Sequence, residues 1–499
     1  MTDEQALTQK ATHAMSCKTR STGCAREASF AKFTPDWHSP MGLAAKASAF
    51  SCALLLTVLF PSAARAAQAP SGTTAFVHVN VVPMDRERVL RDQTVIVEDG
   101  RIKAIGRFLA VPANAEVIDG HGFFLSPGLA DMHIHSETRN DLAVYLANGV
   151  TTVLHMGGAR AGFVDSIVPA VNRGSIPGPH VYTSFYVDGS TDYNGFVIKT
   201  PAQARAIVGL AKTNGYDFIK VYVGLAPDVF AALADEGRGQ GMPLVGHGVT
   251  AVRLDRQLAQ GQVLVAHSEE FFYTFFTPPG MEETDTPPDA MRIPTAIALA
   301  KKYNATVTAD LATYAAIAHQ MQHPDVVSSF LARPEASYLS PNDRLTWQTS
   351  DYVRKTAKLE PKLRFLRRMV KAMADAGVDL VAGTDSPAVP GMLPGVSLHD
   401  DLDELESSGL TRFQALSTAT RVPGEFIART KGGEPFGIVA PGYWANLILS
   451  KDNPLAGLST LRTPMGVMVD GRWRDADALA ALLDHVRQAY IGSMVPLAH

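Results

Sequence analysis

Two histidines one residue apart, His133 and His135, follow an apolar run and a Pro127-Gly128 pair that is typical of a turn into a strand. In an extended strand the side chains of residues i and i+2 point to the same side, so both imidazoles are expected to project into one space. Neutral imidazole is the commonest metal ligand near neutral pH, and the pair therefore predicts half of a metal site. Two strand-end histidines that bond only backbone and solvent are the alternative that the pair alone leaves open.

The size and charge of the chain limit what this strand can belong to. With 499 residues, 46% hydrophobic and 19% charged, the chain can bury a large core and form a single barrel domain. The net charge of -4 provides no basic field for nucleic acid, so nucleic-acid binding is not expected.

The first seventy residues differ in character from the rest. Residues 1–40 are polar and aperiodic, and we expect a non-native or disordered extension without function, the true start being Met41. Residues 41–67 combine a charged start, an apolar run and a small-residue cleavage site, which is typical of a secretory signal peptide. A periplasmic or secreted protein without a stable membrane anchor is expected, an uncleaved anchor being the alternative. All three cysteines precede the cleavage site, so the mature protein would form no disulfide.

β-rich runs near both ends predict a small β-sandwich domain built from residues 73–122 and 427–475. Each part contains a hairpin signal, Asp99-Gly100 in the first and Asp470-Gly471 in the second. A C-terminal helix and tail are expected over residues 476–499.

Between residues 123 and 426, strand-like and helix-like stretches alternate, which predicts parallel crossovers and a closed (β/α)8 TIM-like barrel of α/β class with its chemistry at the carboxyl ends of the strands. Residues 271–362 exceed simple barrel connections, so we expect flap and lid segments there around one barrel strand, with the aromatic run after Glu270 in a mobile flap. The strand candidates are 129–135, 149–154, 180–183, 217–223, 243–247, 263–267, 305–308 and 379–385.

Polar residues occupy these strands where apolar ones would be expected. Lys220 lies inside a strand, whereas His247, His267 and Asp385 each end one. Singly, a strand-end histidine is more often structural, and a lysine can extend its amine outward. Together with the first two histidines they make six polar residues at one end of successive strands, which favours a metal centre.

The sequence resembles the metal-dependent amidohydrolase superfamily, nearest to its imidazolonepropionase and Xaa-Pro dipeptidase-like branch. The resemblance extends over about residues 73–474. The most specific matching segments are residues Pro127 to His135, Gly149 to Val153 and Gly383 to Ser386.

This resemblance implies two divalent metal ions, zinc first with manganese, cobalt or iron as alternatives, and carbon dioxide to carboxylate a lysine. A buried neutral amine can add carbon dioxide and become a bidentate carbamate that bridges two ions. The implied ligands are His133, His135 and Asp385 for one ion, His247 and His267 for the second, and Lys220 as the bridge.

Two such ions can share a water, lower its pKa and polarise the scissile carbonyl. Asp385 is placed to take the proton of this water and pass it to the leaving nitrogen. Tyr222, two residues beyond Lys220, is expected to donate to the substrate or its oxyanion, a core tyrosine being the alternative.

Three further residues have two interpretations each. His155 stands where relatives often carry an acidic residue, and it either alters the pocket or belongs to an unrelated loop. Glu269 and Glu270 either meet a cationic substrate group or form a solvated surface pair.

The expected function is that of a secreted metal-dependent hydrolase of amide-type C–N bonds. Its substrate would be a small molecule such as an N-acyl amino acid, a dipeptide such as Xaa-Pro, or a cyclic amide. The alternatives are an esterase or lactonase that uses the same centre, and a non-catalytic metal- or solute-binding protein. The sequence leaves a homo-oligomer open.

Overall fold

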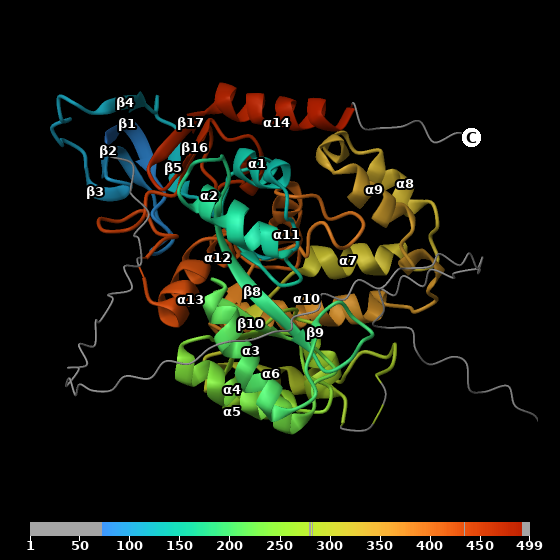
Figure 1. Ribbon diagram of the computed structural model, residues 1–499. Helices are drawn as coiled ribbons and strands as arrows, with labels where there is room; N and C mark the ends of the chain where they lie inside the picture. Colours follow the sequence, from blue (N-terminus) through green and yellow to red (C-terminus); the bar gives the residue numbers. More distant parts are fainter. Residues whose placement is uncertain (1–71, 279–280, 282, 434, 492–499) are drawn as a thin grey trace, which may run out of the picture. The chain divides into compact units, whose positions relative to one another are not determined.

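A computed structural model describes residues 72–278, 281, 283–433 and 435–491 (Figure 1). The proposed extension and signal peptide lie outside the described residues. Within the described ranges, none of the helices combines the length and the apolar character needed to cross a membrane.

Eight parallel strands of the described chain form a barrel whose spatial order follows the sequence from β6 to β14. The ring nearly closes, because the amide of Met132 donates to the carbonyl of Ala382 at 3.0 Å and Ile134 bridges to Ser386. The predicted (β/α)8 barrel is therefore confirmed. Its strands are β6 (Leu129–Ile134), β7 (Val150–His155), β8 (His180–Asp188), β10 (Phe218–Val221), β11 (Leu244–Gly246), β12 (Gln262–Val265), β13 (Thr306–Thr308) and β14 (Leu380–Val381).

Helices connect most of the barrel strands, and three of them begin at a capping box, in which a threonine and the residue three positions later bond each other's backbone amides. These three are α1 (Arg139–Ala147), α3 (Pro201–Thr213) and α12 (Arg412–Thr418). The others include α2 (Val168–Asn172), α4 (Pro227–Gln240), α5 (Leu254–Gln260), α6 (Ile293–Lys302), α10 (Glu360–Asp375), α11 (Val396–Ser407) and α13 (Arg421–Lys431).

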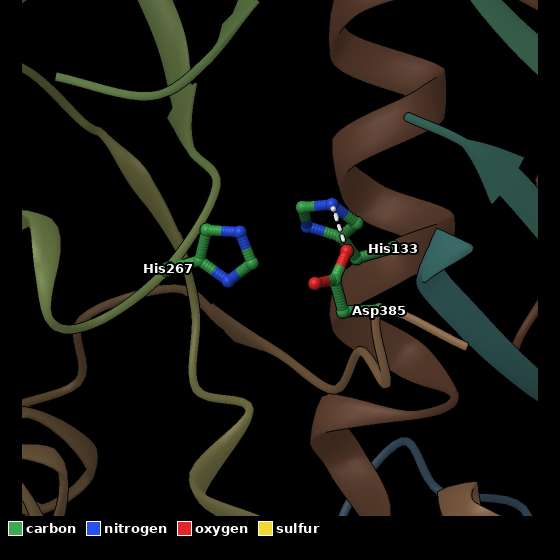
Figure 2. A group of neighbouring side chains, drawn as sticks. All are labelled: His133, His267 and Asp385. Atoms are coloured by element: carbon green, nitrogen blue, oxygen red, sulfur yellow. Dashed lines mark ion pairs between the residues drawn. The ribbon is translucent and has the colours of Figure 1, made fainter. Parts of the chain in front are cut away.

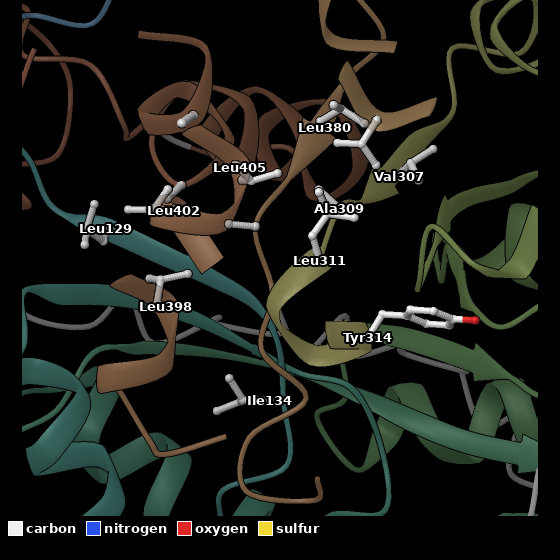
Figure 3. Close-up of a cluster of buried hydrophobic side chains, with 14 of the residues drawn as sticks. Leu129, Ile134, Val307, Ala309, Leu311, Tyr314, Leu380, Leu398, Leu402 and Leu405 are labelled. Carbon is white, nitrogen blue, oxygen red and sulfur yellow. The ribbon is translucent and has the colours of Figure 1, made fainter. Parts of the chain in front are cut away.

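The main core lies between the barrel strands and these helices (Figure 3). Leu398, Leu402 and Leu405 of α11 recur at the spacing of one helix face, and all three are buried. They share a cluster with Leu129 of β6 and Leu380 of β14. Burial of each such leucine stabilises the fold by about 1.5–3 kcal/mol.

Strands from both ends of the chain form one mixed eight-stranded sheet, in which β5 and β15 pair antiparallel (Figure 1). Asp99-Gly100 and Asp470-Gly471 both turn with positive φ, which suits two-residue hairpins. The predicted union of both ends is confirmed, although hydrogen bonds link the strands into one continuous sheet. Its strands are β1 (Thr73–Val81), β2 (Leu90–Glu98), β3 (Arg101–Gly106), β4 (Glu116–Asp119), β5 (Phe124–Pro127), β15 (Leu447–Ser450), β16 (Gly466–Val469) and β17 (Arg472–Asp475), followed by helix α14 (Ala476–Ile491).

The long insertion between β13 and α10 is helical. It contains α7 (Leu311–Gln320), α8 (Val326–Leu331), α9 (Pro341–Gln348) and the short turn η5 (Tyr352–Arg354).

The aromatic run that was expected in a mobile flap instead forms a buried π-helical turn, η2 (Phe272–Phe276). Phe271 and Phe272 are at most 1% exposed, and the ring of Phe272 lies 5.6 Å from that of Phe365 in α10. Consecutive aromatic side chains carry more apolar area than an exposed flap can leave in water, so the run joins the core.

Candidate metal centre and active site

All six polar residues singled out in the sequence lie at the carboxyl-end mouth of the barrel. Lys220 is inside β10. Each of the other residues lies near the carboxyl end of a strand or within four residues after it. His133 belongs to β6, with His135 just beyond it; His247, His267 and Asp385 follow β11, β12 and β14.

Short distances join these side chains into one cluster. Oδ1 of Asp385 lies 3.1 Å from Nε2 of His133 and 2.9 Å from Nε2 of His135. The ring of His267 lies 4.4 Å from that of His133 and 4.8 Å from that of His247. Figure 2 shows His267 facing His133 and Asp385 across a gap.

The donor set fits a divalent cation. Potential ligand atoms of His133, His267 and Asp385 all lie within 4.8 Å of one another. Nε2 of His133 has no hydrogen-bond partner among the described residues, although it is buried and faces Asp385. Buried imidazole and carboxylate groups that converge in this way are the usual ligands of zinc and related ions.

In His133, His135 and His267 the ring nitrogen Nδ1 is hydrogen-bonded. A carbonyl oxygen can only accept, so Nδ1 carries the proton where it meets one and Nε2 is left as a free ligand. The partners of Nδ1 are the carbonyls of Ala266 for His133 and of Gly157 for His135, each at 3.1 Å, and the carboxyl group of Asp310 for His267.

Lys220 is 2% exposed, and its Nζ lies 5.3 Å and 5.5 Å from the ring centres of Tyr186 and Tyr222. Burial lowers the pKa of Lys220 to about 8, against the opposing effect of Asp385 and Glu270. Within the described part of the chain its amine forms no ion pair with a carboxylate. A buried amine in this state is suited to lose its proton.

Asp385 is held at the centre by its backbone, because its amide donates to the carbonyl of His133 at 2.8 Å. Burial alone would raise the pKa of Asp385, but His133 and His135 hold it well below its usual range. The carboxylate is therefore ionised at neutral pH.

Asp131 was not predicted as a residue of the site, although an acidic residue in an otherwise apolar strand could have pointed to such a role. Its carboxylate accepts from the hydroxyl of Thr384 at 2.7 Å and from the amide of His133 at 3.2 Å. It thereby ties β6 to the segment that carries Asp385.

The structure excludes one of the two interpretations of the acidic pair. Glu270 is 1% exposed, accepts from the amide of Gly248 at 2.9 Å and lies 3.7 Å from Nε2 of His247. Glu269 lines the same cavity, so the two are not a solvated surface pair. His155 is also buried beside the centre, 5.8 Å from the ring of His135, and its ring nitrogens have no hydrogen-bond partner among the described residues.

A cavity of about 380 Å³ opens onto the metal-ligand cluster. Tyr222 lines it, with its ring 4.1 Å from that of His247. Lys355 and Lys362 also line the cavity, and Lys362 pairs with Glu283. Five further tyrosines line the cavity: Tyr186, Tyr193, Tyr273, Tyr314 and Tyr352.

Comparisons with known proteins agree with this geometry. No protein-family model matches the chain. A dihydroorotase from Geotalea daltonii is 30% identical over 187 residues, which is 36% of this chain and 39% of that protein. The chain thus spans less than two fifths of the length of the first curated relatives that it matches.

Two solved structures share the fold over most of their length. A bottromycin amidohydrolase is 23% identical with a TM-score of 0.65 and covers 84% of this chain and 90% of its own. A Xaa-Pro dipeptidase with bound methionine is 16% identical with a TM-score of 0.60 and covers 81% of this chain and 100% of its own. The chain therefore shares the fold of these two hydrolases, and part of its sequence is similar to a dihydroorotase.

Proposed function

We propose that this chain is a metal-dependent hydrolase that cleaves the amide-type C–N bond of an N-acyl amino acid or a dipeptide. The observation that carries the proposal is the convergence of four histidines, Asp385 and the buried Lys220 at the mouth of the barrel. A bound divalent ion supplies a Lewis acid for the substrate carbonyl and lowers the pKa of water.

The donor set supports two neighbouring ions. His133, His135 and Asp385 would hold one, and His247 and His267 would hold the other. Lys220 would bridge them as a carbamate, formed when its neutral amine bonds to the carbon of carbon dioxide and loses a proton. This assignment is supported by the burial of Lys220 and by the lack of a carboxylate ion pair within the described residues.

Asp385 is the proposed proton carrier. One oxygen of its carboxylate accepts the proton of the attacking water as the water oxygen bonds to the carbonyl carbon. The same proton passes to the leaving nitrogen as the C–N bond breaks. The hydroxyl of Tyr222 donates a hydrogen bond to the carbonyl oxygen, on which negative charge accumulates.

A lysine that lines the cavity favours a substrate with a carboxylate. Lys355 has no ion pair with a carboxylate in the described ranges, and its Nζ lies 4.8 Å from the ring centre of Tyr352. Lys362 is buried, lines the same cavity and pairs with Glu283. The ammonium group of Lys355 is available to a substrate carboxylate, which favours N-acyl amino acids and dipeptides over uncharged cyclic amides.

The test offers metal-loaded mature protein N-acyl amino acids, Xaa-Pro dipeptides, their carboxamide analogues, esters and lactones. We expect the free carboxylates to be hydrolysed with the highest kcat/KM, and treatment with a chelator to abolish turnover. Faster hydrolysis of lactones would establish the esterase or lactonase alternative. Metal-loaded protein without any turnover would support a binding protein.

A further inference from the structure

Asp310 begins helix α7 but does not cap it. An aspartate at this position usually accepts from the backbone amides of the first helical turn. Here no such bond from its side chain exists, and the residue adopts φ 28° and ψ 44°, a conformation that is rare for residues other than glycine. The carboxylate, 1% exposed, is directed elsewhere.

Another residue satisfies the helix in its place. Oδ1 of Asp401, from α11, accepts from the amide of Ala312 in the first turn of α7 at 3.1 Å. Asp401 is fully buried and lies 91 positions further along the chain. Because a distant carboxylate caps α7, Asp310 is available for a different partner.

That partner is the segment of His267. Oδ2 of Asp310 is hydrogen-bonded to Nδ1 of His267, and Oδ1 accepts from the amide of Ser268. The hydroxyl of Ser268 in turn donates to the carbonyl of Ala309 at 3.0 Å. Side-chain bonds therefore join the residues after β12 to those after β13 at three points.

We propose that Asp310 is a positioning residue that fixes the ring and the tautomer of His267, so that the Nε2 lone pair points into the metal centre. The inference rests on the proposed function, since it concerns the loading of that centre. The bond holds the ring in place, and an ionised carboxylate can only accept, whereas an amide in the same place can donate to Nδ1 and move the ring proton to Nε2.

The test compares Asp310→Asn with Asp401→Asn. Both remove a buried carboxylate at the start of α7, but Asp401 does not contact His267 among its described bonds. Affinity for Zn²⁺ is measured by competition with a chelator, and folding by circular dichroism. We expect Asp310→Asn to bind the metal about 10–100-fold more weakly, and Asp401→Asn to melt at a lower temperature with near wild-type affinity. Equal affinities in the two variants, or a folded Asp310→Asn that binds as tightly as wild type, would overturn the proposal.

A second measurement on the unmodified protein keeps the proposal testable if Asp310→Asn does not fold. In ¹⁵N-histidine-labelled protein, the resonances absent from His267→Gln are assigned to His267. We expect a proton on Nδ1 and none on Nε2, and a proton on Nε2 would overturn the proposal. Wild-type protein that binds no divalent metal would contradict the proposed function. The tautomer of His267, measured separately, would still test whether Asp310 positions its ring.

Discussion

The side chain of Lys220 occupies the space that a side chain at Gly157 would need. A Cβ atom added at Gly157 would lie 3.0 Å from Cδ of Lys220 and 2.8 Å from Cβ of Tyr186, and the residue has φ +101°. Its carbonyl also accepts from Nδ1 of His135. The backbone at Gly157 therefore helps to position the side chains of both Lys220, the proposed bridge, and His135, a proposed metal ligand.

Replacement of Gly157 by alanine should displace Lys220 and lower both metal content and kcat. Gly158→Ala is the matched control, because Gly158 also has a positive φ of +78° but no atom within 4 Å of an added Cβ. Both variants should lose about 1–3 kcal/mol of stability from backbone strain. Only Gly157→Ala should lose metal, measured by elemental analysis; equal losses would show that strain, and not contact with Lys220, is responsible.

Lys220→Ala should lose most metal and activity, because the proposed carbamate needs the amine. A short carboxylic acid at high concentration should partly restore turnover by taking the place of the bridge. Lys431→Ala removes another lysine amine, one that donates to the carbonyl of Asp217, and should keep its metal. Full metal content and normal kcat in Lys220→Ala would show that Lys220 is only a buried lysine.

Lys362 should contribute to the affinity for carboxylate substrates by exchanging its ion pair with Glu283 for one with the substrate. Burial lowers the pKa of Lys362 to about 8, so its charge is present below pH 8 and is lost above it. KM for an N-acyl amino acid should therefore rise above pH 8. In Lys362→Met it should be raised about 10-fold or more at pH 7, on the scale of a charged hydrogen bond, and should no longer depend on pH in this range.

Lys358→Ala, a change at an exposed residue near the same helix, provides the control for Lys362. The KM of this variant should equal that of wild type. If the carboxamide analogue of the substrate binds as well as the carboxylate does, Lys362 is no anion subsite.

The barrel and the six cluster residues could be predicted because their signals are local. Each of the six lies within a predicted strand or ends one, and parallel strands place their carboxyl ends at one mouth. The role of Asp310 could not be predicted, since it depends on His267 and Asp401, which only the folded barrel brings near. The burial of Glu270 could not be predicted from the sequence either, because a charged pair after a strand is usually solvated.

The proposed signal peptide leads to a prediction about export. Residues 41–67 combine an apolar run with Ala64-Arg65-Ala66, a small-residue cleavage site. Protein recovered from the periplasm or the medium should therefore begin near Ala67 or Gln68. Mass analysis of the exported, active form checks this, and finding Met1 on that form would contradict it.

Asp385→Asn should separate chemistry from metal binding. Asparagine keeps the size of the side chain and one oxygen but cannot take a proton from water, so kcat should fall by roughly 10²–10⁴-fold with a modest change in KM. His133→Ala should instead lower metal occupancy and thermal stability together, because a metal that binds only the folded state no longer stabilises it. Both are measured by elemental analysis, melting and steady-state kinetics on the same preparations. Near wild-type kcat in Asp385→Asn across the pH range would exclude Asp385 as the proton acceptor, even with the metal centre intact.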